Sequence, residues 1–355
     1  MMIDVNDRKP VELARRENLR RKKPFVYAKI MKYDDIVRAG GSVAIVDICY
    51  DYICNMNCSH CCNMRFAEKE RKLTVADLRD FSEQADALGL AQVNISGGEP
   101  LLFRDLDEIV RAIDPSRFHI SISTNGLFLD ERKAIHLINI GVDKVKISLD
   151  SLNETVYLQT RRQDGAYEKA KESLHIAKSA GLQVSVQTVI SHQTARTKAT
   201  EQLAEFCQMN GFNFDIMIAK AIGRWEGKEE VLIDHEDAAH LVELRNRYSL
   251  VQRDVFPSYG ESSGGCVAVL KTLHLTKYGD ILPCGFIHIS IGNIFQEPLK
   301  DIINRGFSIK YFHKRHPICL SGEDRNFIRR YMSKFYGKPL PIHWTEAFSD
   351  EDLVK

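Results

Sequence analysis

Between residues 42 and 220 the chain alternates short β-branched runs with amphipathic helical patterns. The strand candidates are 42–50, 91–96, 118–123, 143–149, 182–190 and 212–218. The helical patterns between them lie near 74–89, 104–114, 130–140, 167–180 and 197–210. Nearly continuous apolar strands joined by helices are typical of a parallel sheet that is buried on both faces. The pattern predicts an α/β fold, either doubly wound or curved as a partial barrel.

The composition narrows the class of protein further. The 49 basic and 48 acidic residues nearly cancel, so there is no overall field that would attract nucleic acid or a membrane surface. No apolar run approaches the ~18 residues that a membrane span needs, and the N-terminal "MMIDVNDRKP" lacks the apolar core of a secretory signal. We therefore expect a cytoplasmic protein with neither a membrane nor a nucleic-acid partner.

The pattern divides the chain into five segments. Six lysines and arginines lie between Arg15 and Lys23, which we interpret as a solvated helix face or arm. After residue 220 the chain becomes polar and loop-rich, with one helix predicted near 234–249. The predicted segments are a basic extension (1–41), the βα core (42–220), a connection (221–263), a small α+β module (264–322) and a C-terminal helix and tail (323–355).

Four of the nine cysteines fall in "CNMNCSHCC", residues 54–62, directly after the first strand candidate. Loops at the carboxyl ends of parallel strands are where active sites lie. Cys54, Cys58 and Cys61 have C-x3-C-x2-C spacing, which suits three corners of a [4Fe–4S] cluster with one iron left open. The alternatives are a zinc site completed by His60 or a downstream cysteine, and a purely structural iron–sulfur site. We expect Cys49, Cys62 and Cys207 to be small buried apolar residues.

Polar motifs also follow the next three strand candidates. They are "SGGEPLL" with Gly97, Gly98 and Glu99, "STNGLFL" with Thr124 and Asn125, and "SLDS" with Ser148 and Asp150. Paired glycines allow a close backbone approach to a ligand, and a carboxylate beside them can hold an ammonium group. Each motif alone could be an ordinary turn or helix cap. Their order at successive strand ends favours one shared ligand site.

These motifs together resemble the radical S-adenosylmethionine (radical SAM) superfamily over roughly residues 42–220. The resemblance implies a partial (β/α)6 TIM-like barrel in which Cys54, Cys58 and Cys61 hold a [4Fe–4S] cluster whose open iron is chelated by SAM. The remaining implied contacts to SAM are the glycine–glutamate loop at the methionyl amino group, Ser148 and Asp150 near the ribose and methionyl part, and Arg161 or Arg162 at the carboxylate. His60 stands where the family often has a large apolar or aromatic residue near the adenine, and Thr124 and Asn125 complete the implied SAM site.

The three downstream cysteines belong to a second pattern. "LHLTKYGDILPCGF" predicts a hairpin that ends at Cys284, and "ISIGNIFQEPLKDIINRG" predicts a short strand leading into a helix. With Cys266 and Cys319, this stretch resembles the SPASM/twitch extension and implies an auxiliary [4Fe–4S] cluster. No cysteine follows Cys319, so the fourth ligand would be absent or an oxygen, for which Glu323 and Asp324 are candidates. The alternative is a module without a cluster whose cysteines only pack.

The resemblance implies reductive cleavage of SAM to a 5′-deoxyadenosyl radical, which takes a hydrogen atom from the substrate. Its implied partners are a small molecule of sugar or nucleoside type and an electron donor of the flavodoxin or ferredoxin type. The reaction would be an oxidation, epimerisation or decarboxylation. The alternatives are maturation of a ribosomally made peptide and, from another class, a non-catalytic electron-transfer protein.

Overall fold

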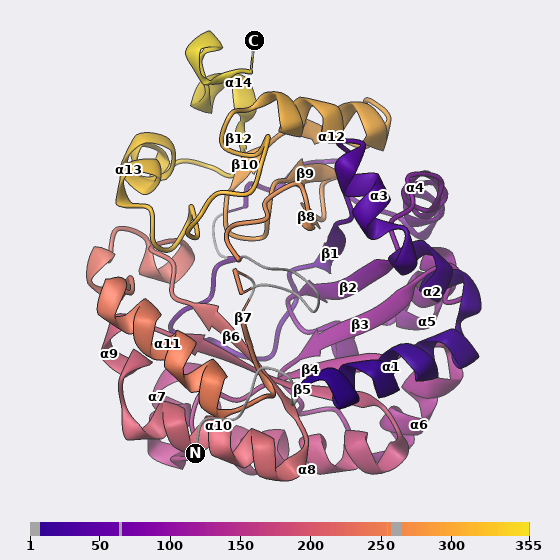
Figure 1. The fold of residues 1–355 in the computed structure, drawn as a ribbon, viewed down its shortest axis with the longest axis vertical. Coiled ribbons are helices and arrows are strands. Elements are labelled where there is room, and N and C mark those ends of the chain that lie inside the picture. Colours follow the sequence, from indigo (N-terminus) through magenta and orange to yellow (C-terminus); the bar gives the residue numbers. More distant parts are fainter. Residues whose placement is uncertain (1–7, 64–65, 254, 257–263, 355) are drawn as a thin grey trace.

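The computed structural model describes residues 8–63, 66–253, 255–256 and 264–354, and it contains all six predicted strands of the core (Figure 1). Each strand pairs in parallel with the next strand along the chain. The strands are β1 (Ile45–Asp51), β2 (Gln92–Gly97), β3 (His119–Thr124), β4 (Lys144–Ser148), β5 (Gln183–Ile190) and β6 (Asn213–Ile218). Their carboxyl ends therefore meet at one edge of the sheet.

The five predicted helices of the core are also present, and Figure 1 shows helices along the outer side of the sheet. Local signals set their ends: Thr74 and Asp77 form a capping box at the start of α4, and Gly181, with φ of +101°, ends α8. The core helices are α4 (Val75–Ala87), α5 (Leu106–Ile113), α6 (Glu131–Asn139), α7 (Glu154–Arg161), α8 (Ala166–Ala180), α9 (His192–Ala195) and α10 (Lys198–Asn210).

The two faces of the core sheet differ in chemistry. Alternate residues such as Val46, Ile48 and Val145 are fully buried in the hydrophobic core. The residues between them are polar and lie on the opposite face, which we call the inner face. Its polar residues on β1 to β6 include Asp47, Asn94, Ser121, Ser123, Lys144, Lys146, Ser185 and Asp215.

The sheet continues beyond the six core strands at both edges. The helix predicted near 234–249 is α11 (His235–Arg247), and it leads to β7 (Val251–Arg253), which pairs with β6. The predicted hairpin is β8 (Thr272–Leu275) with β9 (Asp280–Leu282), and β8 pairs in parallel with β1. With β11 (Gly292–Asn293) at the far edge, the order is β11-β9-β8-β1-β2-β3-β4-β5-β6-β7. The hairpin that ends two residues before Cys284 is therefore joined to the core sheet through main-chain hydrogen bonds.

The N-terminal segment forms three helices, α1 (Arg8–Lys22), α2 (Pro24–Met31) and α3 (Tyr33–Arg38). The prediction of a solvated helix face fits Arg20, which is exposed and pairs with Glu17 on its own helix. Lys23 is different, because its Nζ atom donates to the Asp143 carboxylate at 2.5 Å and to the Phe118 carbonyl at 3.0 Å. These contacts tie the segment to the amino ends of β3 and β4, at the edge opposite the predicted site.

The C-terminal segment packs on the module that carries the hairpin. Its β12 (Ile342–His343) pairs with β10 (Ile289–Ser290) of that module, which also contains α12 (Leu299–Ser308). The segment itself contains α13 (Arg325–Phe327) and α14 (Trp344–Ala347). The Val354 amide donates to the Ser308 carbonyl at 2.7 Å, so the end of the chain braces α12. Within the residues described, no helix combines the length and apolar character that crossing a bilayer requires.

Candidate active site

The cysteine-rich loop begins at Cys54, three residues after the end of β1, at the carboxyl edge of the sheet. Cys54 is exposed, whereas Cys58 and Cys61 are partly buried. The Ser59 amide donates to the Thr160 carbonyl of α7 at 2.8 Å, which fixes the middle of the loop. The three thiols thus share one short, anchored loop with access from solvent.

The spacing of the thiols bears on the kind of metal centre. Four ligands around one zinc ion at ~2.3 Å place their sulfurs about 3.8 Å apart. Among the described residues, Cys54, Cys58 and Cys61 do not lie as close together as the ligands of a single ion do, and neither do the C-terminal cysteines. His192, Asp234 and Asp237 do lie that close together. Asp234 and Asp237 form the capping box of α11, and Arg196 pairs with Asp237, so that group has a structural role. The described residues thus contain no preformed single-ion site at either set of cysteines.

The paired glycines, Gly97 and Gly98, lie against the backbone of residues 51–53. A Cβ atom on Gly98 would lie 1.9 Å from the Ile53 carbonyl oxygen, and one on Gly97 would lie 2.4 Å from the Asp51 carbonyl oxygen. The Gly98 and Glu99 amides donate to these same carbonyls of Asp51 and Ile53, both at 2.8 Å. The glycines therefore allow the second loop to lie directly against the backbone that leads into Cys54.

Glu99 is almost fully buried and held by three protein donors. Its carboxylate accepts from Thr124 Oγ1 at 2.6 Å, from the Asn125 amide at 2.8 Å and from the Leu101 amide at 3.1 Å. Burial raises the pKa of Glu99, although these hydrogen bonds oppose the rise. Since a carboxylate accepts about four hydrogen bonds, one acceptor position remains for a ligand donor.

Asp150 and Arg161 form a buried, two-point ion pair. Arg161 Nε lies 2.6 Å from Asp150 Oδ2, and Nη2 lies 3.1 Å from Oδ1. Burial alone would raise the pKa of Asp150, but the Arg161 guanidinium keeps it below its usual range. The third nitrogen, Nη1, lies 3.9 Å from the Cys58 sulfur. Arg162 is exposed at the end of α7 with φ of +55°, so Arg161 is the arginine that faces the cysteine loop.

Two buried polar atoms near this ion pair have no hydrogen-bond partner among the described residues: His60 Nδ1 and Tyr157 Oη. Burial, with Arg161 adding to it, lowers the pKa of His60 to about 4, so the imidazole is neutral. Its ring centroid lies 5.6 Å from that of Trp225. Unsatisfied buried polar groups cost ~1–3 kcal/mol each, which a polar ligand would offset. Three thiols, a guanidinium and these two atoms fit a [4Fe–4S] cluster carrying a polar, zwitterionic cofactor.

The remaining predicted site residues lie on the same edge. Asn125 donates from Nδ2 to Asn55 Oδ1 at 2.8 Å, which joins the third loop to the cysteine loop. Ser148 ends β4 two residues before Asp150. Sequence reasoning missed Asn63, whose side chain donates to the Gly97 carbonyl at 2.8 Å, and Tyr157. Their only sequence signals were closeness to Cys61 in the first case and to Arg161 in the second.

Cys49, Cys62 and Cys207 are not cluster candidates. Cys49 and Cys207 are fully buried, as predicted for small apolar residues. Cys62 is only partly buried, and its thiol lies 3.6 Å from Asn63 Oδ1. Burial, with Cys61 and Asp47 adding to it, raises the pKa of Cys62 to about 12. Asp47 on the inner face of the sheet is thus close enough to Cys62 to act on it electrostatically.

The C-terminal cysteines also lie near one another. Burial raises the pKa of Cys266 well above its usual value, and the neighbouring Cys319 and Cys284 add to the rise. Burial raises the pKa of Cys284 to about 12, while the Phe286 amide opposes the rise by donating to the thiol. Backbone amides that donate to sulfur are a common feature of iron–sulfur sites. The three thiols could hold three corners of a second cluster.

The two candidate oxygen ligands are already engaged by protein groups. Glu323 Oε2 accepts from Arg253 Nη2 at 2.5 Å and from the Cys319 amide at 2.9 Å. Asp324 accepts from the Phe327 amide at 2.9 Å and caps α13. Glu323 Oε2 thus helps to position Cys319, and both carboxylates already accept hydrogen bonds from protein groups.

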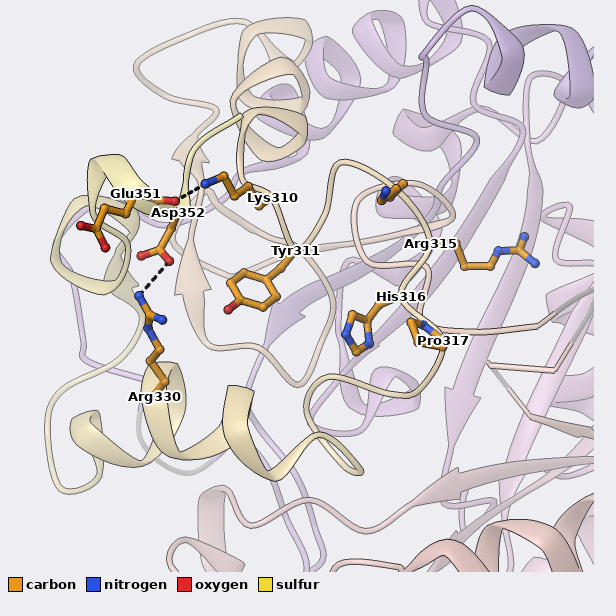
Figure 2. A pocket seen from close by; sticks show the side chains of 9 residues that line it. Lys310, Tyr311, Arg315, His316, Pro317, Arg330, Glu351 and Asp352 are labelled. Carbon is orange, nitrogen blue, oxygen red and sulfur yellow. Dashed lines mark hydrogen bonds and ion pairs between the residues drawn. The ribbon is translucent and has the colours of Figure 1, made fainter. Parts of the chain in front are cut away.

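A surface cavity of about 450 Å³ lies elsewhere, on the C-terminal segment. Figure 2 shows Arg330 paired with Asp352, at 3.2 Å, and Lys310 donating to the Glu351 carbonyl. The cavity is lined by none of the predicted site residues. It is therefore distinct from the site at the carboxyl edge of the sheet.

Comparison with known proteins agrees with this geometry. Residues 51–207 match the radical SAM superfamily, and residues 266–321 match the SPASM iron–sulfur cluster-binding domain. This chain is a radical SAM enzyme with a SPASM domain. The first domain implies a [4Fe–4S] cluster with SAM, and the SPASM domain implies auxiliary iron–sulfur binding. Both expectations from the motifs are confirmed at the level of the domain.

Two proteins that are similar to this chain in sequence have names that state different activities. An AdoMet-dependent heme synthase of Methanosarcina barkeri is 22% identical over 277 residues, which are 70% of this chain and 78% of that protein. A probable GTP 3′,8-cyclase of Methanocella arvoryzae is 35% identical over 129 residues, which are 36% of this chain and 41% of that protein. The similarity to the cyclase therefore covers less than half of either chain.

Solved structures show the same fold. SuiB of Streptococcus suis, bound to precursor peptide SuiA, superposes with a TM-score of 0.58 at 16% identity, over 78% of this chain and 69% of that chain. The structure of anSMEcpe with bound AdoMet also gives 0.58 at 16% identity, over 78% and 83% of the two chains. These likenesses confirm the predicted partial-barrel α/β fold.

Proposed function

We propose that this radical SAM enzyme removes a hydrogen atom from a small, polar metabolite of sugar or nucleoside type held against the inner face of the sheet. The [4Fe–4S] cluster with SAM supplies a 5′-deoxyadenosyl radical for that step. The outcome would be an oxidation, epimerisation or decarboxylation. The protein would contribute binding, orientation and exclusion of water.

In this proposal Cys54, Cys58 and Cys61 hold the cluster that works with SAM. Their loop is anchored to α7 through Ser59, and it lies at the edge where the carboxyl ends of the strands meet. The Arg161 guanidinium beside Cys58 would offset part of the negative charge of thiolate ligands. Arg161 is already paired with Asp150, so its remaining nitrogen, Nη1, is the group available to the SAM carboxylate.

The other proposed SAM contacts surround this loop. Glu99 keeps one acceptor position for the methionyl ammonium group, and the backbone at Gly97 and Gly98 frames that position. His60, being neutral and packed near Trp225, is suited to lie against the adenine. The further residues in this set are Thr124, Asn125, Ser148 and Asp150.

Cys266, Cys284 and Cys319 would hold one auxiliary [4Fe–4S] cluster, with the fourth iron open. Supporting this are the mutual closeness of the thiols and the engagement of Glu323 by Arg253. An external one-electron donor of the flavodoxin or ferredoxin type would supply the electron for SAM cleavage. The open corner would leave the auxiliary cluster free to accept an electron or to meet the substrate.

The observation that carries the choice of substrate is the hydrogen-bonding capacity of the inner face beside the cysteine loop. Asn94 Nδ2 donates to Asp47 Oδ1 at 2.5 Å and to Ser123 Oγ at 3.1 Å, and Ser121 Oγ donates to Asn94 Oδ1 at 2.8 Å. Lys144 pairs with Asp215 at 3.3 Å on the same face. Such a surface of donors and acceptors suits a hydroxylated metabolite.

The test uses deuterium transfer into 5′-deoxyadenosine. Reduced, anaerobically reconstituted enzyme is mixed with SAM and a lysate of its source cells grown in D2O, and the lysate is separated into small molecules and peptides. We expect deuterated 5′-deoxyadenosine, detected by mass spectrometry, with the small-molecule fraction. Transfer that requires the peptide fraction, and that a peptidase abolishes, would establish peptide maturation instead. That second candidate is favoured by the shared fold with SuiB, which binds a precursor peptide.

A further inference from the structure

Lys146 is an unusual residue for its place in the fold. It lies in the middle of β4, a central strand of the sheet, with Ser123 of β3 and Ser185 of β5 as its register neighbours. Central parallel strands are normally apolar, and lysine is rarely buried unless it is paired. Lys146 is nevertheless partly buried, on the inner face of the sheet.

The carboxylates nearest to Lys146 already have partners. Asp47 accepts from His274 Nδ1 at 2.9 Å and from Asn94 at 2.5 Å. Asp215 is engaged by Lys144 at 3.3 Å. Both carboxylates act on Lys146 electrostatically without reaching ion-pair distance.

Lys146 itself has no ion-pair or hydrogen-bond partner anywhere in the described part of the chain. An ammonium group has three donors and no acceptor, and enclosing it without a counterion costs free energy. Burial, with the neighbouring Lys144 adding to it, lowers the pKa of Lys146, and Asp215 and Asp47 oppose this fall only in part. An anion at this position would remove the penalty.

We propose that Lys146 binds an anionic group of the substrate, a carboxylate or a phosphate, on the inner face of the sheet. Ser123, which is already a partner of Asn94, lies beside it in register and offers a hydroxyl to the same group. This inference deepens the proposed function by naming the chemistry of the substrate, and it rests on that function only for the statement that the anion belongs to the substrate. Neutral sugars and nucleosides would then be excluded in favour of their phosphorylated or carboxylated forms.

The first test measures anion binding directly and without turnover. Reconstituted enzyme is reductively methylated with formaldehyde and a borane, which are small neutral reagents, in inorganic phosphate, in acetate or in chloride at one ionic strength. Peptide mass spectrometry then gives the methylation rates of Lys146, of ion-paired Lys144 and of exposed Lys169.

We expect phosphate or acetate to protect Lys146 saturably, with the rate falling about threefold at an anion concentration of twice its Kd, by the factor 1 + [L]/Kd. The rates at Lys144 and Lys169 should change far less. The anion that protects at lower concentration distinguishes phosphate from carboxylate. Equal effects at all three lysines, or no effect at Lys146, would overturn the proposal. A complete lack of methylation at Lys146 would also overturn the proposal, because an anion larger than formaldehyde could not reach the side chain either.

The second test asks whether the anion belongs to the substrate. Lys146→Met should raise the amount of small-molecule fraction needed for half-maximal deuterium transfer, Lys146→Arg should largely restore it, and Lys169→Met should have no effect. Wild-type transfer in Lys146→Met would overturn the assignment to the substrate. If wild-type enzyme takes deuterium only from peptides while anion protection at Lys146 persists, the proposed function fails and the anion site remains.

Discussion

Replacing Gly98 with alanine adds only a methyl group, but it should displace the backbone of the cysteine loop. The new Cβ atom would lie 1.9 Å from the Ile53 carbonyl oxygen, where real contacts are not found below 3.0 Å, so backbone must move by about 1.1 Å. Ile53 directly precedes Cys54. The movement would also strain the hydrogen bonds from the Gly98 and Glu99 amides, both at 2.8 Å.

The magnitude follows from these two effects. Losing two hydrogen bonds costs about 1 kcal/mol each, and overpacking costs about 1–3 kcal/mol. The free energy of unfolding should therefore fall by about 3–5 kcal/mol. For 355 residues at ~2.1 cal/mol/K per residue, this corresponds to a fall in Tm of about 4–7 °C.

The assay is anaerobic thermal unfolding together with iron and sulfide content after reconstitution. Gly40→Ala is the control for a glycine-to-alanine change without a clash, because nothing lies within 4 Å of the new Cβ atom; its φ of +78° adds a left-handed strain that Gly98 does not have. That control should lose only about 1–2 kcal/mol and keep all its iron. A Gly98→Ala protein with wild-type Tm and full iron content would refute the reasoning.

Three further predictions concern the two clusters and the buried ionisable groups. Changing Cys266, Cys284 and Cys319 together to alanine should lower iron from about eight to about four per chain; iron that stays at the wild-type level would show that these thiols only pack. Arg161→Met leaves the buried Asp150 carboxylate without its counterion, so the free energy of unfolding in urea should fall by about 3–5 kcal/mol. Arg162→Met, at an exposed position, should lower it by less than about 0.5 kcal/mol. Equal effects would contradict the assignment to Arg161. Burial lowers the pKa of His288 to about 4, so the unfolded chain binds its proton first and stability falls as pH drops from about 6.5 toward 4. Between pH 7.5 and 5.0, wild type should lose about 2 kcal/mol more than His288→Gln, and parallel pH profiles of the two proteins would exclude this.

The parallel sheet of the core and the position of the site could be predicted because both depend on local patterns. Apolar runs separated by helical segments determine a parallel sheet, and a parallel sheet brings the loops after its strands to one edge. Cys54, Glu99 and Asp150 could therefore be placed together before any contact was known. The same reasoning located the hairpin at Cys284, because its turn residues are local too.

The role of the glycine pair could be predicted only in part. A need for close backbone approach was evident in Gly97 and Gly98, but the approach that the structure shows is to Asp51 and Ile53. Nothing in the local sequence states which surface a glycine faces. Likewise, the choice of Arg161 over Arg162 depends on where α7 ends, and helix ends are the least predictable part of an element.

The sequence by itself determined the alternating core, the two sets of three cysteines and the polar loops, because each depends on residue types at short spacing. Only the tertiary structure decided that β8 pairs with β1, that Arg253 pairs with Glu323 and that Lys146 has no partner among the described residues. These three facts depend on contacts between residues far apart in the chain. Such contacts are set by how whole elements pack, since the hydrogen-bonding needs of an edge strand or a buried charge can be met by many different partners.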